Sequence, residues 1–244
     1  VSTDELAPLA VDLCRAGGEL RCVPRLVDVR IMWARRDRVG GGHPPAAWSD
    51  VLDSDLVFGF PGRESGLFGT FFELVVGAGG ALFDADGQPQ LDSAEAEWAV
   101  DVLRRLAARA PDDLPAWHYD QVDEALIEGR VDAVGAWPGA TAAIRRSVLA
   151  DVLEPHPYPR GGHRWVSYAG CHAWAIPTTC GDVEAAAELV RVLCAAPAQA
   201  LDASGGNVCA HVAAFADVDP VDAIDHRRLE VTAATIAEAM ITHQ

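Results

Sequence analysis

Short apolar segments alternate with helical patterns along the whole chain, and this alternation constrains the fold more than any single motif does. Between Ser65 and Trp137, a helix with an aromatic face ends at Gly79-Gly80, and a polar turn and two further helices follow. A short strand then ends in Trp137, directly before Pro138-Gly139. Strands that alternate with helices in this way are typical of an α/β protein.

The periodicity and the turn residues also predict where the individual elements lie. Helices are expected over residues 3–16, 46–52, 66–76, 120–128, 139–148, 198–203 and 225–241, after Asp92 as far as Pro111, and from Asp182 to Pro197. Strands are expected over residues 20–33, in two pieces around Pro24, and over 56–60, 131–136 and 165–177, with a tight hairpin over 81–91 and an extended segment over 151–159.

Composition limits the classes of partner. Half of the 244 residues are hydrophobic, which is enough to fill a sizeable core. The formal net charge of −17 disfavours nucleic acids and anionic membranes, because both require cationic surfaces. All 19 basic residues are arginine, so Schiff-base chemistry and a phosphate-binding P-loop, which both need lysine, are excluded.

No apolar run approaches the ~20 residues of a membrane-spanning helix, and the sequence after Val1 has the acidic Asp4 and Glu5 in place of a basic signal region. We therefore expect a mature portion, a fragment or a cytoplasmic protein. The six cysteines are too few for a disulfide scaffold and form no C-x-x-C pair. Cys14 and Cys194 lie in apolar helical patterns, which predicts buried free thiols.

Several segments, in order, resemble the sugar-binding group of extracellular solute-binding proteins of ABC transporters, which includes maltose-binding protein. The matching segments are residues 23–37 (VPRLVDVRIMWARRD), 44–50 (PPAAWSD), 79–84 (GGALFD) with 91–93 (LDS), 124–133 (EALIEGRVDA), and Gly170 followed by 173–177 (AWAIP). Each match is loose by itself, and their order and spacing carry the resemblance. The chain departs from the family pattern at its two ends, where further elements of the first lobe and the usual C-terminal helices are expected.

The resemblance implies an α/β fold of the periplasmic-binding-protein-like type II, with two lobes, hinge crossings and an incomplete lobe one. Lobe two is expected over residues 28–169 with a C-terminal segment 207–244, and partial lobe one over 1–27 and 170–206. The implied function is binding of a carbohydrate in an inter-lobe cleft for delivery to an ABC transporter permease. The family is extracytoplasmic, cell-surface or periplasmic, and often a lipoprotein. It needs no cofactor, metal or nucleic acid and is not an enzyme.

Trp137 is the strongest candidate for ligand contact, because an indole ring matches the flat apolar face of a sugar; the alternative is a packed core tryptophan. Tyr168, near Gly170 at the second crossing, is a further candidate, whereas Trp174 is expected in the core. Asp28 and Arg30 alternate along the first crossing, so that both side chains would point the same way. They are expected either to hydrogen-bond ligand hydroxyls or to form an ion pair between the lobes.

Glu64 and Ser65 precede the helix at Gly66, where free N–H groups could hold a ligand oxygen; the alternative is an ordinary N-terminal cap. His172 is expected to line the cleft. A metal site at His163, Cys171 and His172 is disfavoured, because adjacent strand residues face opposite ways and no zinc spacing occurs. The segment Gly62-Arg63-Glu64-Ser65-Gly66 has its serine one place too late for a nucleophile elbow.

Two other functions remain open. One is an enzyme or a cytoplasmic biosynthetic protein built on the same scaffold. It is suggested by the absence of a signal region after Val1, the free-looking cysteines and the polar residues His163, Cys171 and His172. The other is a remnant whose lobe two folds but whose affinity for ligand is lost.

Overall fold

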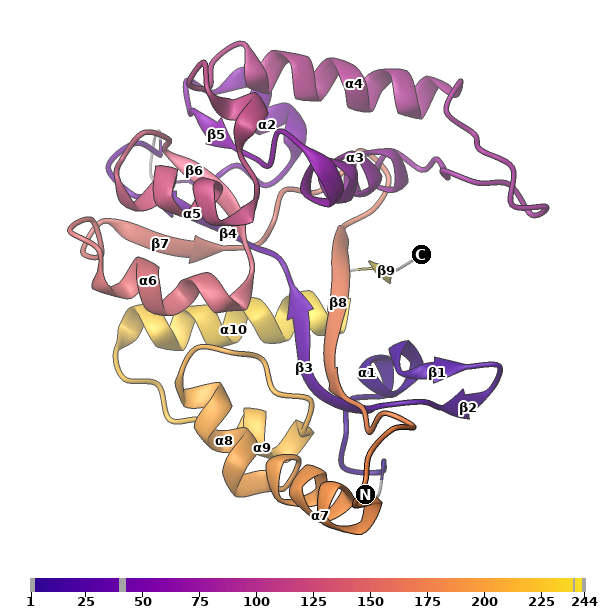
Figure 1. Ribbon diagram of the computed structural model, residues 1–244. Coiled ribbons are helices and arrows are strands. Elements are labelled where there is room, and N and C mark those ends of the chain that lie inside the picture. Colours follow the sequence, from indigo (N-terminus) through magenta and orange to yellow (C-terminus); the bar gives the residue numbers. More distant parts are fainter. Residues whose placement is uncertain (1–2, 40–42, 239, 243–244) are drawn as a thin grey trace. The chain divides into compact units, whose positions relative to one another are not determined.

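The computed structural model describes residues 3–39, 43–238 and 240–242 (Figure 1). The chain divides into two compact units. The first unit comprises residues 3–28 and Ala169–Val221, and the second comprises Val29–Tyr168 and Asp222–Thr242. Each unit is therefore assembled from segments that lie far apart in the sequence.

Two strands continue from one unit into the other. Strand β3 (Val23–Val29) leaves the first unit, and β8 (Val166–Trp174) returns to it. Strand β8 lies between β3 and β9 (Met240–Thr242) in a three-stranded sheet. No helix among the described residues is both long and apolar enough to cross a membrane.

The second unit contains a four-stranded sheet in the order β5-β6-β4-β7. Its strands are β4 (Ile31–Arg35), β5 (Phe58–Gly59), β6 (Ala133–Ala136) and β7 (Leu153–His156). Strand β4 runs antiparallel to β6 and to β7, whereas β5 runs parallel to β6. The central strand β4 is buried along most of its length, which agrees with its continuous apolar sequence.

The described residues of this unit include six α-helices. They are α2 (Trp48–Asp53), α3 (Glu64–Gly77), α4 (Ala94–Ala107), α5 (Tyr119–Ile127), α6 (Thr141–Arg146) and α10 (Ala223–Glu238). Helix α4 packs beside α3, and α10 lies against β7 and β4 (Figure 1). The start of α4 is fixed by Ser93, whose side chain accepts a hydrogen bond from the N–H of Ala96.

Aromatic side chains fill the core of the second unit. Trp48 contacts Phe58 and Tyr158 edge-to-face, with ring centroids 5.2 and 5.4 Å apart. All three rings are buried, together with Trp33 of β4. Edge-to-face packing of large rings adds to the hydrophobic contribution and holds the sheet against its helices.

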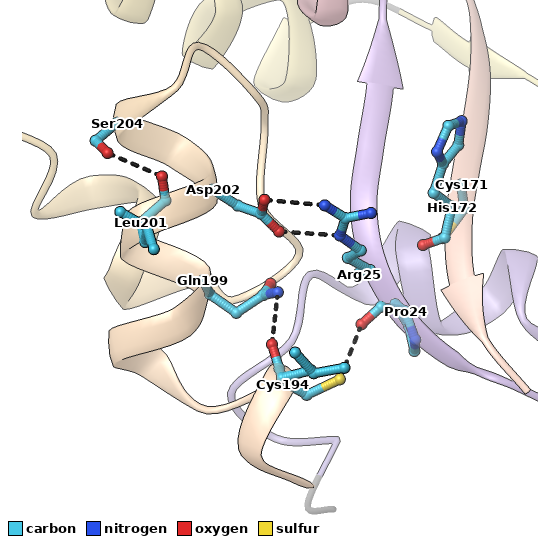
Figure 2. Close-up of polar contacts among 10 residues, drawn as sticks. Pro24, Arg25, Cys171, His172, Cys194, Gln199, Leu201, Asp202 and Ser204 are labelled. Atoms are coloured by element: carbon cyan, nitrogen blue, oxygen red, sulfur yellow. Dashed lines mark hydrogen bonds and ion pairs between the residues drawn. The ribbon is translucent and has the colours of Figure 1, made fainter. Parts of the chain in front are cut away.

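The first unit is smaller and mainly helical. It contains α1 (Pro8–Leu13), β1 (Arg15–Ala16), β2 (Glu19–Leu20), α7 (Val183–Leu193), α8 (Ala196–Ser204) and α9 (Val212–Ala216). The guanidinium of Arg25 on β3 donates to both carboxylate oxygens of Asp202 on α8, at 2.9 and 3.0 Å (Figure 2). This bidentate pair anchors α8 to the strand.

Residues 207–221, which we predicted in the second lobe, pack with the first unit instead. Cys209 forms an isolated antiparallel bridge with Leu26, and His211 forms one with Leu6. These backbone pairings with the N-terminal segment could not be anticipated from the local sequence pattern.

Helix α7 has no buried residue, although one side of it is apolar. Leu189 and Val192 are 59% and 56% exposed. A helix with a polar and an apolar side normally buries the apolar side. The first unit thus lacks packing partners for α7 within the described residues, as an incomplete lobe would.

Most predicted elements occur within a few residues of their expected positions, but β9 occupies residues expected to end the last helix, and helix α9 was not predicted. Two boundaries also differ for physical reasons that the structure shows. Helix α1 begins at Pro8 rather than at residue 3, since proline is favoured in the first helical turn and Leu6 is engaged in the bridge to His211. The break in the first crossing falls at Arg30, between β3 and β4, and not at Pro24. Pro24 is tolerated because it lies at the start of its strand.

The imidazole of His156, at the end of β7, is buried and is expected to make the second unit sensitive to acid. Burial, and then the nearby charge of Arg227, lower the pKa of His156 to about 4. A neutral histidine with a depressed pKa contributes stability above its unfolded pKa of about 6.5, and this contribution is lost as the pH falls through 4. We expect His156→Gln to reduce the loss of unfolding free energy between pH 6.5 and 4 by about 3 kcal/mol or less.

Denaturant unfolding of His156→Gln and of the unmodified chain at several pH values measures this difference. Equal pH slopes for His156→Gln and the unmodified chain would contradict the expectation.

Candidate functional site

Five aromatic rings from four segments meet on the second unit. This aromatic cluster consists of Phe68 and Phe72 on α3, Tyr119 at the start of α5, Trp137 after β6, and Tyr168 on β8. Phe72 is buried and Phe68 is 40% exposed, whereas the other three rings are half-buried. The cluster therefore combines one buried ring, Phe72, with rings that are partly accessible to solvent.

Trp137 is central to the cluster. Its ring lies edge-to-face with Tyr119 and with Tyr168, at centroid distances of 6.0 and 6.2 Å. The Arg30 guanidinium carbon lies 4.9 Å from the centroid of the indole. Strand β6 delivers Trp137 to this place, and the short helical turn Pro138–Ala140 carries the chain away. These contacts fix the indole while leaving part of it accessible.

Arg30 is buried beside the cluster, and its Nη1 pairs with residues of the second unit, whereas its Nε and Nη2 are buried without a hydrogen-bond partner among the described residues. It donates to Glu73 at 2.9 Å and to Thr70 at 3.1 Å, and only 1–2% of the Arg30 and Glu73 side chains is exposed. Burial raises the pKa of Glu73, opposed by Arg30 and by the N–H that Tyr168 donates at 2.8 Å. Arg30 thus orients Glu73 and Trp137 rather than offering a free surface to solvent.

Asp123 on α5 adds a titratable group near Arg30. Burial, and then the neighbouring charge of Asp120, raise the pKa of Asp123 to about 7, while Arg30 opposes this shift. A carboxyl group with such a pKa is partly protonated near neutral pH. It can then donate as well as accept a hydrogen bond.

Ser65 and His118 supply polar atoms beside the aromatic cluster. The Ser65 hydroxyl lies 3.4 Å from His118 Nε2, and the His118 ring contacts Tyr119 at a centroid distance of 4.3 Å. Neither Glu64 nor Ser65 is the N-cap of α3, because Arg63 occupies that position and makes no side-chain cap. The ordinary-cap alternative for these two residues is therefore wrong.

Glu64 is exposed and has a backbone φ of 53°. A positive φ is uncommon for a residue other than glycine, and such strain is often found at functional positions. It turns the chain sharply into α3, directly before Ser65. The exposed side chain of Glu64 lies 3.3 Å from the guanidinium of Arg63.

Asp28, Gly170 and His172 lie together in the first unit. His172 Nε2 is 3.3 Å from Asp28 Oδ2, and a Cβ on Gly170 would lie 3.6 Å from the same oxygen. Burial raises the pKa of Asp28, and the neighbouring His172 opposes that effect. Asp28 thus pairs with His172 within the first unit, and Arg30 pairs with Glu73 within the second.

The three residues that suggested an enzyme, His163, Cys171 and His172, do not all belong to one unit. His163 belongs to the second unit and lies beside Gly79, whereas Cys171 and His172 belong to the first. Over the described ranges of the chain, no group of three or more histidine, cysteine or acidic side chains is arranged to hold a metal ion.

Two cavities lie elsewhere. One of about 310 Å³ in the first unit is lined by Leu20, Trp174 and Val190 among others. Trp174, expected in the core, is only half-buried there. The other, of about 380 Å³ in the second unit, is lined by Trp98, Arg160 and His163 among others. Neither includes a residue of the aromatic cluster.

The family model for bacterial extracellular solute-binding proteins matches residues 14–200, which is more than half of the chain. The chain belongs to this family. A relative from Sinorhizobium fredii, described as "Probable amino-acid ABC transporter periplasmic-binding protein y4oP", is 27% identical over 164 residues, covering 60% of this chain. The chain spans only 38% of the length of that relative.

Solved structures show the same fold. The chain is similar to maltose-bound MalE3 of T. maritima, with a TM-score of 0.87 and 20% identity over 98% of this chain and 66% of the other. It is also similar to the maltose-maltodextrin binding protein of Alicyclobacillus acidocaldarius, with a TM-score of 0.73 and 17% identity over 99% of this chain and 66% of the other. The fold is thus that of type II periplasmic binding proteins with an incomplete lobe, as the sequence predicted.

Four residues in and beside the aromatic cluster were not singled out from the sequence: Phe68, Phe72, His118 and Tyr119. Phe68 and Phe72 are four residues apart on α3, so their spacing indicates a shared helix side. No local signal in the sequence points to His118 or Tyr119, because they reach the cluster through the way α5 packs beside Trp137.

Proposed function

We propose that this family member binds a carbohydrate on the aromatic cluster of the second unit, for delivery to an ABC transporter permease. The observation that carries the proposal is the half-buried indole of Trp137, held edge-to-face between Tyr119 and Tyr168. A flat ring of this kind matches the apolar C–H face of a pyranose. The Ser65 and His118 side chains supply hydroxyl and imidazole groups for hydrogen bonds with sugar hydroxyls.

The relatives support a small solute and differ on its class. The T. maritima and A. acidocaldarius structures are of maltose-binding proteins, whereas the S. fredii relative is described as an amino-acid-binding protein. A free amino acid requires charged partners for its ammonium and carboxylate groups. Arg30, the cation at the aromatic cluster, is buried and paired with Glu73, so the cluster suits a neutral polyhydroxylated ligand better.

Calorimetry of the 244-residue chain against maltose, longer oligosaccharides, alditols and amino acids tests the proposal. Trp137→Ala is expected to lower sugar affinity about 10- to 100-fold, because truncating a central aromatic contact removes both its area and its geometry. Trp98→Ala is the matched control, since Trp98 is also half-buried but lines a different cavity. Circular dichroism checks that both variants remain folded.

Three results would contradict the proposal. They are equal sugar affinities for Trp137→Ala and the unmodified chain, binding of amino acids without binding of sugars, and no binding of any sugar by the folded chain. The last result would favour a remnant that has lost its affinity.

A further inference from the structure

Three of the six cysteines lie together in the first unit. Cys14 Sγ is 3.8 Å from Cys171 Sγ, and Cys22 Sγ is 4.0 Å from the carbonyl oxygen of Cys14. Cys14 directly follows α1, Cys22 precedes β3, and Cys171 lies on β8. The contact between the Cys14 and Cys171 sulfurs thus joins positions that are 157 residues apart in the sequence.

Cys171 also donates to the carbonyls of His172 and Ala10, at 3.5 and 3.9 Å. The other three cysteines make bonds of this second kind, and none of them has a sulfur–sulfur contact within the described part of the chain. Cys194 donates to the carbonyl of Pro24 at 3.8 Å (Figure 2), Cys209 to that of His211 at 3.5 Å, and Cys180 to that of Asp182 at 3.3 Å. A weak S–H···O bond of this kind is the ordinary state of a structural thiol. The sulfur–sulfur contact therefore distinguishes Cys14 and Cys171 from these three thiols.

The Cys14–Cys171 contact is close to the geometry of a disulfide. The two sulfurs must approach from 3.8 Å to about 2.0 Å for a bond to form. Cys14 is the C-terminal cap of α1, and Cys171 lies on β8. Rotation of the two side chains about their Cα–Cβ bonds is the movement that would bring the sulfurs together.

We propose that Cys14 and Cys171 form a reversible disulfide, by exchange with a small-molecule or protein disulfide, that ties the N-terminal segment to β8. The family is extracellular, and disulfides form and persist in oxidising compartments. The pairing goes beyond solute binding and does not depend on it.

The exchange proceeds in two steps that balance. The Cys171 thiolate attacks one sulfur of the external disulfide, forming a mixed disulfide and releasing the first external thiol. Cys14 then attacks the Cys171 sulfur and displaces the second external thiol. Overall, two protein thiols are oxidised to one disulfide, while the external disulfide takes up two electrons and two protons and is reduced to two thiols.

The burial of the two thiols sets the order of attack. Cys14 is only 3% exposed, and its burial raises its pKa. Cys171 is less buried, and although burial raises its pKa too, the hydrogen bond with Cys14 opposes that shift. The thiolate is the attacking form, so Cys171 reacts first with an external disulfide.

The disulfide would lie directly beside the contact between His172 and Asp28. Cys171 and His172 follow each other on β8, beside β3 (Figure 2). A covalent link at Cys171 restricts this part of β8 relative to α1. It also closes a very long loop, which reduces the entropy of the unfolded chain.

The test uses the purified chain, reduced with a phosphine and then incubated with glutathione disulfide. We expect the number of alkylatable thiols in the denatured protein to fall from six to four, as one pair is consumed. Peptide mapping without reduction should recover one cross-link, between the peptides that carry Cys14 and Cys171. The melting temperature should rise by about 5–10 °C on oxidation and return on reduction.

Cysteine variants assign the pair. Cys14→Ser and Cys171→Ser should each keep five thiols after oxidation and show no rise in melting temperature. Cys180→Ser and Cys22→Ser, the controls, should fall from five thiols to three. Six remaining thiols in the oxidised unmodified chain, or a cross-link that involves Cys22, would overturn the proposal. Mapping of the unmodified chain decides the question even if a variant does not fold.

Discussion

Replacing Glu73 with glutamine is expected to lower the free energy of unfolding of the second unit by about 3–5 kcal/mol, because it leaves the charge of Arg30 buried without its counter-charge. Both side chains are almost fully buried and lie 2.9 Å apart. Glu73 also accepts the backbone N–H of Tyr168 at 2.8 Å. Denaturant unfolding followed by tryptophan fluorescence measures the loss.

Two variants show whether the loss comes from the buried charge. Glu64→Gln removes one member of the exposed Arg63–Glu64 pair and should change stability by less than about 0.5 kcal/mol. The double variant Arg30→Met with Glu73→Leu removes both charges and should be less destabilised than Glu73→Gln alone. Equal free energies of unfolding for Glu73→Gln and Glu64→Gln would show that the ion pair between Arg30 and Glu73 does not stabilise the second unit.

Replacing Gly161 with alanine is expected to destabilise the second unit by about 3 kcal/mol or more, because the added methyl group meets backbone rather than a movable side chain. A Cβ on Gly161 would lie 2.2 Å from the carbonyl carbon and oxygen of Gly77. That carbonyl ends α3 and accepts hydrogen bonds from the N–H groups of His163 and Arg164, both at 3.0 Å. Relief of the clash must therefore break these bonds or displace the helix.

The neighbouring Gly162 provides a control in the same loop. A Cβ there would meet no atom within 4 Å. Gly162→Ala should leave stability unchanged or raise it by up to about 1 kcal/mol, since alanine restricts the unfolded chain. Thermal melting of the two variants compares them directly, and equal melting temperatures would show that the contact between Gly161 and Gly77 is not tight.

The sequence predicted the elements well where periodicity was long or turn residues were clear. The helix after Asp92 has apolar residues at helical spacing from Trp98 to Leu106, and α4 lies there. The Gly161-Gly162 pair predicted a loop. The structure shows that Gly161, and not Gly162, lies against Gly77. This depends on how α3 packs beside the loop, and the local sequence does not predict it.

The candidate site could be predicted only in part. Trp137 and Tyr168 were found from strand ends near glycines, and they contact each other in the structure. Because Asp28 and Arg30 are two residues apart, we predicted that their side chains point the same way. However, β3 ends at Val29 and β4 begins at Ile31, so the alternation of side chains along a strand does not extend to Arg30. The partner of Arg30 is Glu73, 43 residues away, and such a distant pairing is set by tertiary packing.

Helix α10 determines when the second unit can be completed during synthesis. It packs against β4 and β7, and Arg227 on α10 donates to the carbonyl of Pro155 at 3.0 Å. The ribosome makes the whole Ala169–Val221 segment of the first unit before it reaches this helix. A nascent chain that already contains the four-stranded sheet therefore leaves one side of β4 and β7 uncovered until residues 223–238 emerge.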